Sequence, residues 1–260
     1  MSTLNPTSRI EITIHPKEGQ KIRITGEGLD GLTFREARPG ELVTLTRKGG
    51  REFRGRVLSV NRHEAWVMVF ESLVPPTESS TNIILLQALP DKERMELIIQ
   101  KATELGVDSI VPFKSKRSIA LEERERRQPK AHRWQSIAIK AAQQSRRGTV
   151  PLVEPYCDFS EALGYTEESD LKILLWEKER KNPLKHVLRS QEHYGKVALM
   201  VGPEGGFDPE EIRRAQERGF IPVTLGRRIL RTETAAIVLL GIVQYELGDL
   251  GQRVGKGGRS

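Results

Sequence analysis

With 260 residues, of which 37% are hydrophobic and 30% charged, the chain is long enough for two domains, each with its own core. The single cysteine, Cys157, excludes a disulfide framework within the chain and favours a small buried thiol over a nucleophile. The first ten residues hold no apolar stretch of a signal peptide, and the longest apolar run, 235–243, is too short to span a bilayer. We therefore expect a cytoplasmic protein.

The formal net charge of +7 indicates an anionic partner. Much of this charge lies in residues 113–148, which hold 4 Lys and 7 Arg against 3 Glu, a net charge of +8. Such a segment is either a solvated helical face, with its glutamates paired to neighbouring arginines, or a surface that contacts phosphates. The charge pattern alone leaves both interpretations open.

Residues 1–74 contain five segments in which apolar and polar residues alternate as in half-buried strands, at 10–14, 21–25, 42–46, 52–60 and 65–71. With no long helix among them, they predict a small β-barrel. Arginine outnumbers lysine nine to three here, and its planar guanidinium group suits phosphates and guanine edges. The sequence VPPTESST at 74–81 predicts a linker, where we place the domain boundary.

Beyond the linker the pattern becomes that of a parallel α/β sheet. A buried strand at 83–88 is followed by a helix that opens at Pro90-Asp91 and ends at Gly106. Arg94 lies off the apolar stripe of this helix, where most charges face solvent. A strand at 107–113 completes a βαβ unit.

Three more elements follow before the C-terminal part. We predict a basic helix from about 129 to 145, a core strand at 171–176 and a helix that opens at Asn182-Pro183.

The stretch 196–243 carries the clearest local signals. A strand at 197–201 runs into the Gly-rich turn GPEGG at 202–206. Asp208, Pro209 and Glu211 then form the capping box of a helix that ends at Gly219.

A strand at 221–225 and a polar loop at 226–231 come next, followed by an apolar helix from about Ala235 that Thr232 or Thr234 can cap. We expect this helix to be buried. The two loops after the strands lie at the carboxyl ends of neighbouring strands, where α/β sheets bind ligands.

Other chemistries lack their signals. GPEGG is followed by no Lys-Ser/Thr pair and does not match GxGxxG, and by itself it is compatible with an ordinary turn. No nucleophilic triad is recognisable. The histidines are scattered and predict no metal site: His15, His63, His132, His186 and His193.

GPEGGF followed by LGRRILRTETAA closely resembles the C-terminal signature of the SPOUT class of methyltransferases, and within that class the ribosomal RNA small subunit methyltransferase E family. Three further segments are similar to family segments in the same order: RMELIIQKATELGVDSIVPF at 94–113, WQSIAIKAAQQSRR at 134–147 and YELGDLG at 245–251. The resemblance covers about the last two thirds of the chain and is loosest before Leu32.

The resemblance implies a particular α/β architecture. Residues 82–251 are expected to form a SPOUT methyltransferase domain with a deep trefoil knot, which dimerises as in the family. Residues 1–74 are expected to form a PUA-like β-barrel that binds RNA, and 252–260 a basic flexible tail.

The family's cofactor is S-adenosylmethionine, and its reaction is the methylation of uridine N3 in the decoding region of 16S ribosomal RNA, on the small ribosomal subunit. A Cβ added at Gly205 is expected to enter the space of the ligand. The resemblance implies that the knot loops hold the cofactor through Gly202, Pro203, Glu204, Gly205, Gly206, Leu225, Gly226, Leu230, Arg231, Thr232, Thr234 and Ala235, with Ile229 as a further apolar wall.

The chemistry of uridine N3 suggests roles for three charged residues. N3 carries a proton and sits on the Watson–Crick edge, so the base must be unpaired and the site must offer a base or a stabilising cation. Arg231 is our first choice for that cation. Glu204 and Glu233 are candidates for accepting the proton or for holding Arg231, with purely structural roles as the alternative.

Two other functions compete with this interpretation. One is a non-enzymatic RNA-binding or ribosome assembly factor, and the other is a nucleotide-dependent metabolic enzyme, against which the missing phosphate fingerprint argues. The residues predicted to contact RNA are Arg35, Arg38, Arg54, Arg117, Gln144, Arg146 and Arg147.

Overall fold

The computed structural model describes residues 9–47, 51–73, 78–118, 133–190 and 194–251. Most of the predicted linker, the acidic–basic segment 119–132 and the predicted tail therefore lie outside the described residues. The chain forms two compact units. Among the described residues, the first comprises those up to Glu78 together with Ile139–Val150, and the second comprises those of Ser79–Ala138 and from Pro151 onward.

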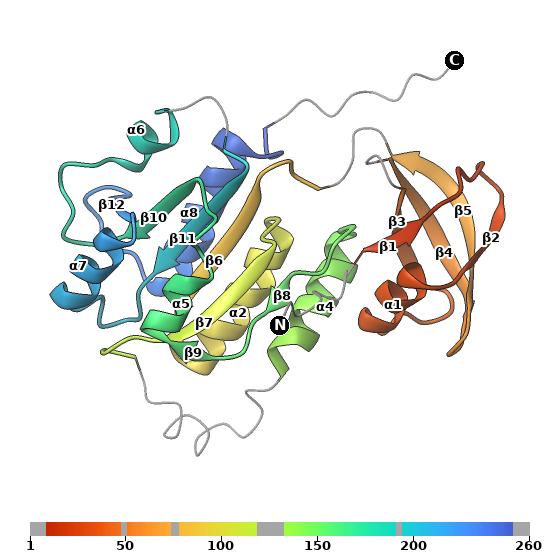
Figure 1. Cartoon of the computed structure of the whole chain (residues 1–260), viewed down its shortest axis with the longest axis horizontal. Coiled ribbons are helices and arrows are strands. Elements are labelled where there is room, and N and C mark those ends of the chain that lie inside the picture. Colours follow the sequence, from red (N-terminus) through yellow and green to blue (C-terminus); the bar gives the residue numbers. More distant parts are fainter. Residues whose placement is uncertain (1–8, 48–50, 74–77, 119–132, 191–193, 252–260) are drawn as a thin grey trace. The chain divides into compact units, whose positions relative to one another are not determined.

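The first unit is built on a five-stranded sheet with the order β1-β3-β4-β5-β2 (Figure 1). All neighbouring strands are antiparallel except β1 and β3, which run parallel with Ile10 opposite Leu45. Ile10, Leu45 and Phe53 are among the buried side chains of its core. The strands match the five predicted segments: β1 (Ile10–Ile12), β2 (Lys21–Ile24), β3 (Leu42–Arg47), β4 (Glu52–Val60) and β5 (Ala65–Leu73).

A helix, α1 (Glu27–Phe34), was not predicted from the sequence of this unit. Its sequence EGLDGLTF contains two glycines, which have low helix propensity. A Cβ at Gly28 would collide with the backbone oxygen of Glu11, and one at Gly31 with that of Arg9. The glycines therefore allow the helix to lie directly against β1, and this packing outweighs the local propensity.

Ile139–Val150, which the sequence places in the second domain, groups with the first unit. Arg35 donates hydrogen bonds to the carbonyl oxygens of Arg147 (3.2 Å) and Gly148, and Arg54 donates to that of Arg146 (2.9 Å). Arg147 also pairs with Glu78 at 2.7 Å. These polar contacts join segments about a hundred residues apart, which no local pattern reports.

The second unit contains a seven-stranded sheet in which every pair is parallel. The order is β12-β10-β11-β6-β7-β8, with β9 also pairing with β7. The predicted parallel α/β fold is therefore confirmed. The strands are β6 (Asn82–Ala88), β7 (Ser109–Lys114), β8 (Leu152–Val153), β9 (Cys157–Asp158), β10 (Leu171–Leu175), β11 (Lys196–Val201) and β12 (Ile221–Val223).

Helices cover both faces of this sheet (Figure 1). On one face α2 (Lys92–Glu104) packs against α8 (Thr232–Leu247), and on the other lie α5 (Phe159–Gly164) and α7 (Pro209–Glu217). The short α6 (Leu184–Leu188) follows the predicted Asn182-Pro183 start and contacts α8. α4 (Trp134–Ser145) corresponds to the described part of the predicted basic helix. None of the described helices is long and apolar enough to cross a membrane.

Helix starts follow the predicted capping chemistry. Asp91 caps α2 by accepting a hydrogen bond from the backbone of Arg94. Asp208 and Glu211 form the complete capping box of α7. α5 begins with the same kind of box, from Asp158 and Glu161, although its six residues are too few to show a helical period in the sequence.

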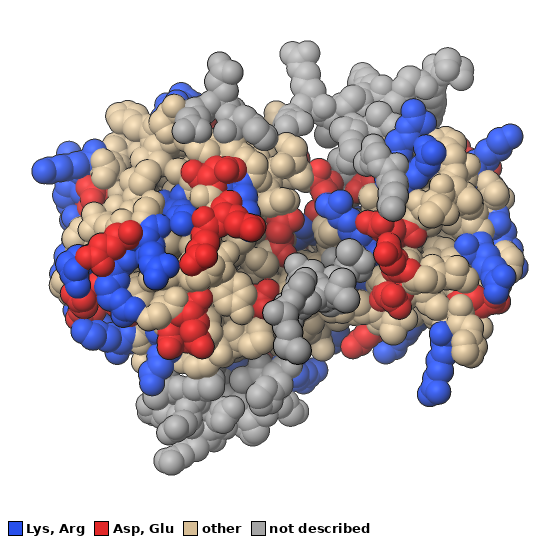
Figure 2. All heavy atoms as spheres, in the orientation of Figure 1, with Lys and Arg blue, Asp and Glu red and all other residues tan. Residues whose placement is uncertain are grey.

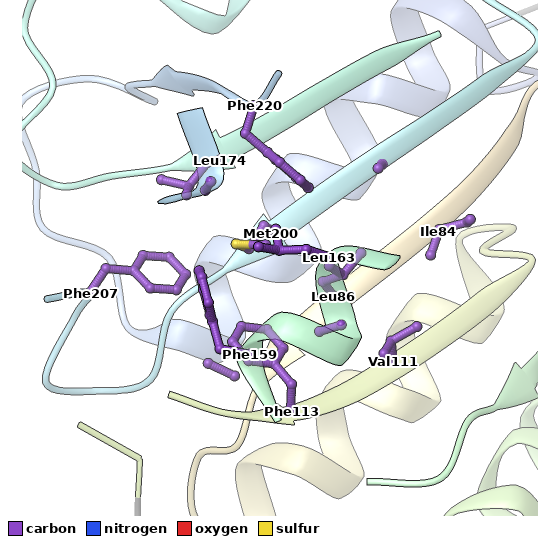
Figure 3. Packing of buried hydrophobic residues seen from close by; sticks show 14 of the residues in the cluster. Ile84, Leu86, Val111, Phe113, Phe159, Leu163, Leu174, Met200, Phe207 and Phe220 are labelled. Carbon is purple, nitrogen blue, oxygen red and sulfur yellow. The ribbon is translucent and has the colours of Figure 1, made fainter. Parts of the chain in front are cut away.

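The core on the α5 and α7 side of the sheet is rich in aromatic side chains (Figure 3). Phe113 of β7 meets Phe159 of α5 edge to face, with ring centroids 5.7 Å apart. Met200 of β11 and Phe207, which follows β11, lie in the same cluster. Burial on both faces explains why these strands read as continuous apolar runs in the sequence.

The last helix, α8, only partly meets the expectation of full burial. Ala236, Leu239, Leu240 and Val243 are buried, but Val238 is 36% exposed and Tyr245 66% exposed. The helix therefore has one face in the core and one face open within this chain.

Candidate active site

A cavity of about 630 Å³ lies at the carboxyl ends of β10, β11 and β12. Its walls are the loops that follow these three strands, the first turn of α8 and Arg94 of α2. The volume falls within the range of small-molecule sites. This is the place where an open parallel sheet is expected to hold a ligand.

The strands that bear the two predicted loops are not neighbours, which corrects the sequence prediction. β10 lies between β11 and β12, so Leu174 pairs with Met200 on one side and with Pro222 on the other. The loop after β10, from Trp176 to Arg180, therefore lies between the two predicted loops and becomes a third wall. Strand order depends on pairing between distant segments, and the sequence contained no signal for it.

Ten of the twelve residues predicted to hold a cofactor line this cavity: Gly202, Pro203, Glu204, Gly206, Leu225, Gly226, Leu230, Arg231, Thr232 and Ala235. Gly205 and Thr234 are not among its lining residues. A Cβ at Gly205 would meet the Cβ of Arg117 at 3.1 Å, so the expectation that it enters the ligand's space is corrected. Thr234 is exposed.

Thr232 ties two of the loops together. Its Oγ1 donates to the carbonyl oxygen of Gly202 at 2.6 Å, and the fully buried Gln87 of β6 donates from Nε2 to the same Oγ1 at 3.2 Å. The prediction that Thr232 or Thr234 caps α8 is wrong, since the helix begins after Arg231 with no side-chain cap. The threonine hydroxyl is used between loops instead.

Arg94 collects the carboxylates near the cavity. Its Nη1 lies 2.5 Å from Oε1 of Glu204 and 3.0 Å from Oδ2 of Asp91, and its Nε lies 3.5 Å from Oε2 of Glu233. The hydrogen bond with Glu204 raises the pKa of Arg94 above its ordinary value. The expectation that these glutamates hold Arg231 is therefore corrected. Sequence analysis missed Arg94 because it sits outside both loop motifs.

Arg231 is the N-cap residue of α8, where the loop after β12 ends. It is exposed and lines the cavity. Among the residues that the structure describes, no carboxylate forms an ion pair with it. Its guanidinium group is therefore available to an anion that forms in the cavity.

A further loop, after β7, is fixed beside the turn at 202–206. The buried Glu211 accepts hydrogen bonds from Ser115 Oγ (3.0 Å) and from the backbone of Lys116 (2.9 Å). Arg117 donates to the carbonyl oxygen of Gly205 at 3.0 Å. The capping box of α7 thus also positions a basic loop near the site.

The residues predicted to contact RNA divide into two groups. Arg38, Arg117, Gln144 and Arg146 are exposed. Arg35, Arg54 and Arg147 are buried, and their guanidinium groups bind the carbonyl oxygens and the carboxylate described above. Burial lowers the pKa of Arg35 to about 10. These three arginines have a structural function within the first unit.

Charges of both signs are interspersed on the face of the molecule shown in Figure 2. The net positive charge of the chain is therefore not gathered into one uniform patch on this face. Local contacts, rather than total charge, identify which basic residues are free to bind an anion.

Residues 77–244 match the model of a family described as the RNA methyltransferase domain. Together with the parallel sheet and the three-loop cavity, this match defines an RNA methyltransferase.

Individual relatives narrow the class. The ribosomal RNA small subunit methyltransferase E of Mycobacterium bovis is 33% identical over 221 residues, which cover 84% of this chain and 83% of the relative. The crystal structure of the enzyme of that name from Neisseria gonorrhoeae, bound to S-adenosyl methionine, is 33% identical, with a TM-score of 0.66 and coverage of 92% of this chain and 98% of that one.

A putative methyltransferase from Legionella pneumophila, solved in complex with its bound cofactor SAM, is also 33% identical, with a TM-score of 0.65 over 94% of this chain and 99% of that one. The chain belongs to the ribosomal RNA small subunit methyltransferase E family. The membership predicted from GPEGGF and LGRRILRTETAA is confirmed.

Proposed function

We propose that the protein transfers a methyl group from S-adenosylmethionine to N3 of a uridine in the decoding region of 16S ribosomal RNA, on the small ribosomal subunit. The observation that carries this proposal is the cavity of about 630 Å³ between the loops after β10, β11 and β12, in a chain of this family. Such a substrate implies a cytoplasmic site of action.

The cavity suits the cofactor in shape and chemistry. Gly202 and Gly206 leave main-chain groups accessible to a flat adenosine, and Leu225 and Leu230 supply apolar wall. Gly206 has φ 66°, so a larger residue there would be strained. When bound, S-adenosylmethionine supplies a methyl group on a sulfonium that is open to in-line displacement.

The residues at the cavity mouth would act on the acceptor. An in-line methyl transfer depends mainly on holding donor and acceptor in line. Uridine N3 becomes a good nucleophile only as its proton leaves, and a cation beside the base stabilises the anion. Arg231 is available for this role, whereas Glu204 and Glu233 are engaged by Arg94. We therefore assign both glutamates to holding Arg94 and the walls of the cavity.

The finer architecture belongs to the same proposal. We infer a deep trefoil knot in 82–251, supported by the insertion of β11 between β6 and β10 and by the meeting of three loops at one cavity. The five-stranded sheet supports a PUA-like RNA-binding domain within 1–74. The exposed Val238 and Tyr245 on α8 support a homodimer through the C-terminal domain.

RNA contacts are assigned to the exposed members of the predicted set. Arg38 and Arg146 belong to the first unit, Arg117 lies in the loop after β7, and Gln144 lies near the end of α4. Guanidinium and amide groups at exposed positions are typical donors to phosphates.

The test is to incubate the protein with labelled S-adenosylmethionine and unmodified small ribosomal subunits, then map the modified base by mass spectrometry. We expect one methylated uridine, with the methyl group on N3. Methylation at another atom would overturn the assigned chemistry. Binding of RNA without any cofactor binding in a calorimetric titration would instead support a non-enzymatic assembly factor.

A further inference from the structure

The rim of the cavity is strongly basic. The described lining residues include six basic side chains, Arg94, Lys178, Arg180, Arg227, Arg228 and Arg231, and two acidic ones, Glu177 and Glu204, which gives a net charge of +4. The whole chain carries only +7. More than half of the net charge of the protein is therefore concentrated around one cavity.

This charge does not serve the proposed methyl donor. S-adenosylmethionine carries a sulfonium, an ammonium and one carboxylate, so it is itself a cation. A basic rim would repel it over the few ångströms that separate charges within one site. The positive potential is therefore directed at the other reactant, which must be an anion.

Two of the six cations already have assigned roles. Arg94 is held by carboxylates, and Arg231 lies at the start of α8 for the reacting base. The remaining four, Lys178, Arg180, Arg227 and Arg228, are all exposed. Among the described residues, none of these four forms an ion pair with a carboxylate.

The loop after β10 is held in a shape that presents its charges. Oε1 of Glu179 accepts hydrogen bonds from the backbone amides of Arg180 (2.8 Å), Lys181 (2.6 Å) and Asn182 (3.2 Å). These backbone hydrogen bonds, that of Lys181 first, lower the pKa of Glu179. Arg180 donates to the carbonyl oxygens of Glu177 (2.6 Å) and Glu179 (2.9 Å), which leaves its charge uncompensated.

We propose that Lys178, Arg180, Arg227 and Arg228 form a binding surface for the phosphates of the RNA strand on either side of the acceptor uridine. The inference rests on the proposed function and extends it, since the two loops that hold the methyl donor would also grip the substrate backbone. The strand must be single at this point, because N3 reacts only when its Watson–Crick edge is free. Basic loops around such a site bind by the general electrostatics of the phosphate backbone.

This surface differs from the predicted RNA contacts in the first unit and in the loop after β7. It lies in the loops after β10 and β12, on the wall of the cavity itself. Its contribution would be independent of base sequence, because phosphate contacts position the strand and do not read it.

The test compares two double variants with a matched control. Lys178→Gln/Arg180→Gln and Arg227→Gln/Arg228→Gln each remove two rim charges. Arg213→Gln/Arg218→Gln removes two charges from side chains that are 60% and 58% exposed, on or just after α7 and outside the cavity lining. All three variants lower the net charge of the protein by the same amount.

Binding of a labelled single-stranded oligoribonucleotide is measured by fluorescence anisotropy over a series of salt concentrations. We expect each rim variant to bind more weakly and to reduce the slope of log K against log salt by about 2, or about 1 for each lost phosphate contact. The control variant should keep the wild-type slope. Calorimetry should show unchanged S-adenosylmethionine affinity in all three.

Equal losses in the rim variants and the control would overturn the inference, because they would reflect net charge alone. Unchanged RNA binding in both rim variants would overturn it as well. Wild-type protein that methylates small subunits while the rim variants bind RNA normally would leave the proposed function standing. Wild-type protein that binds no S-adenosylmethionine would instead remove the proposed function itself.

Discussion

Nη1 of Arg94 lies 2.5 Å from Oε1 of Glu204, which joins the first turn of α2 to the loop after β11. The same carboxylate oxygen accepts a hydrogen bond from the backbone of Asp91 at 3.1 Å. Because Arg94 also approaches Glu233 in the first turn of α8, one side chain links three elements around the cavity. The wall of the cavity is thus held from outside the two loop motifs.

Replacing Arg94 by methionine should weaken S-adenosylmethionine binding roughly tenfold, the scale on which a positioning contact acts. The physical reason is that Glu204 and Glu233 lose the cation that holds them in place. Isothermal titration calorimetry measures the change. Lys92→Met, which removes a weaker pair with Glu96 on the same helix, should bind like the wild type. Arg94→Lys should recover part of the loss, and equal affinities for all four proteins would contradict this role.

Replacing Arg231 by alanine should slow methyl transfer by roughly a hundred- to a thousandfold, as the loss of one stabilising donor does elsewhere. Cofactor affinity should change little, because the effect falls on the uridine anion. Single-turnover rates with small ribosomal subunits test this expectation, with Arg218→Ala as a control away from the cavity. Near-normal turnover in Arg231→Ala would remove this arginine from the mechanism.

Replacing Thr232 by valine should destabilise the protein by roughly 1–3 kcal/mol, because it leaves the buried amide of Gln87 and the carbonyl of Gly202 without their shared partner. Urea unfolding measures the loss. Thr232→Ser keeps the hydroxyl and should retain most of the stability. If serine and valine cost the same, packing of the methyl group rather than the hydrogen bonds would be the reason.

The pair of Glu78 and Arg147 predicts a dependence of stability on pH. Burial raises the pKa of Glu78, but the charge of Arg147 and hydrogen bonds from Arg147 and Thr149 outweigh it and hold this pKa below its ordinary value of 4.5. Because the folded pKa is depressed, the stabilisation is present above pH 4.5 and is lost as the pH falls through the folded pKa.

Glu78→Gln should therefore reduce the free energy of unfolding by about 3 kcal/mol at neutral pH, the cost of removing one partner of a buried pair. The difference from the wild type should shrink as the pH falls below 4.5. Glu71→Gln, at an exposed position of β5, is a matched control. A difference that stays constant from pH 7 to acid would show that Glu78 acts through shape and not charge.

Cys157 should be nearly inert to alkylation. Burial, followed by the charges of Glu161 and Asp158, raises the pKa of its thiol to about 12. At pH 8 the reactive thiolate would then be about one molecule in ten thousand. Iodoacetamide labelling followed by mass spectrometry should be far slower for the native protein than for the protein in urea. Equal rates would contradict the raised pKa.

Local chemistry was predictable from the sequence. The capping residues Asp91 and Asp208, and the end of α7 at Gly219, are interactions among residues a few positions apart, so they are visible in a linear pattern. The family motifs also named ten lining residues of the cavity, because one loop and one helix start contain them all.

What the sequence by itself determined was therefore the two-part organisation of strands and helices, the family, and the two loops that carry the cofactor motifs. Only the tertiary structure decided that β10 lies between the strands bearing those loops, that Arg94 rather than Arg231 holds Glu204 and Glu233, and that Arg35 and Arg54 are buried. The physical reason is that hydrogen bonds and ion pairs between distant segments depend on where the fold brings them, and no local spacing records that.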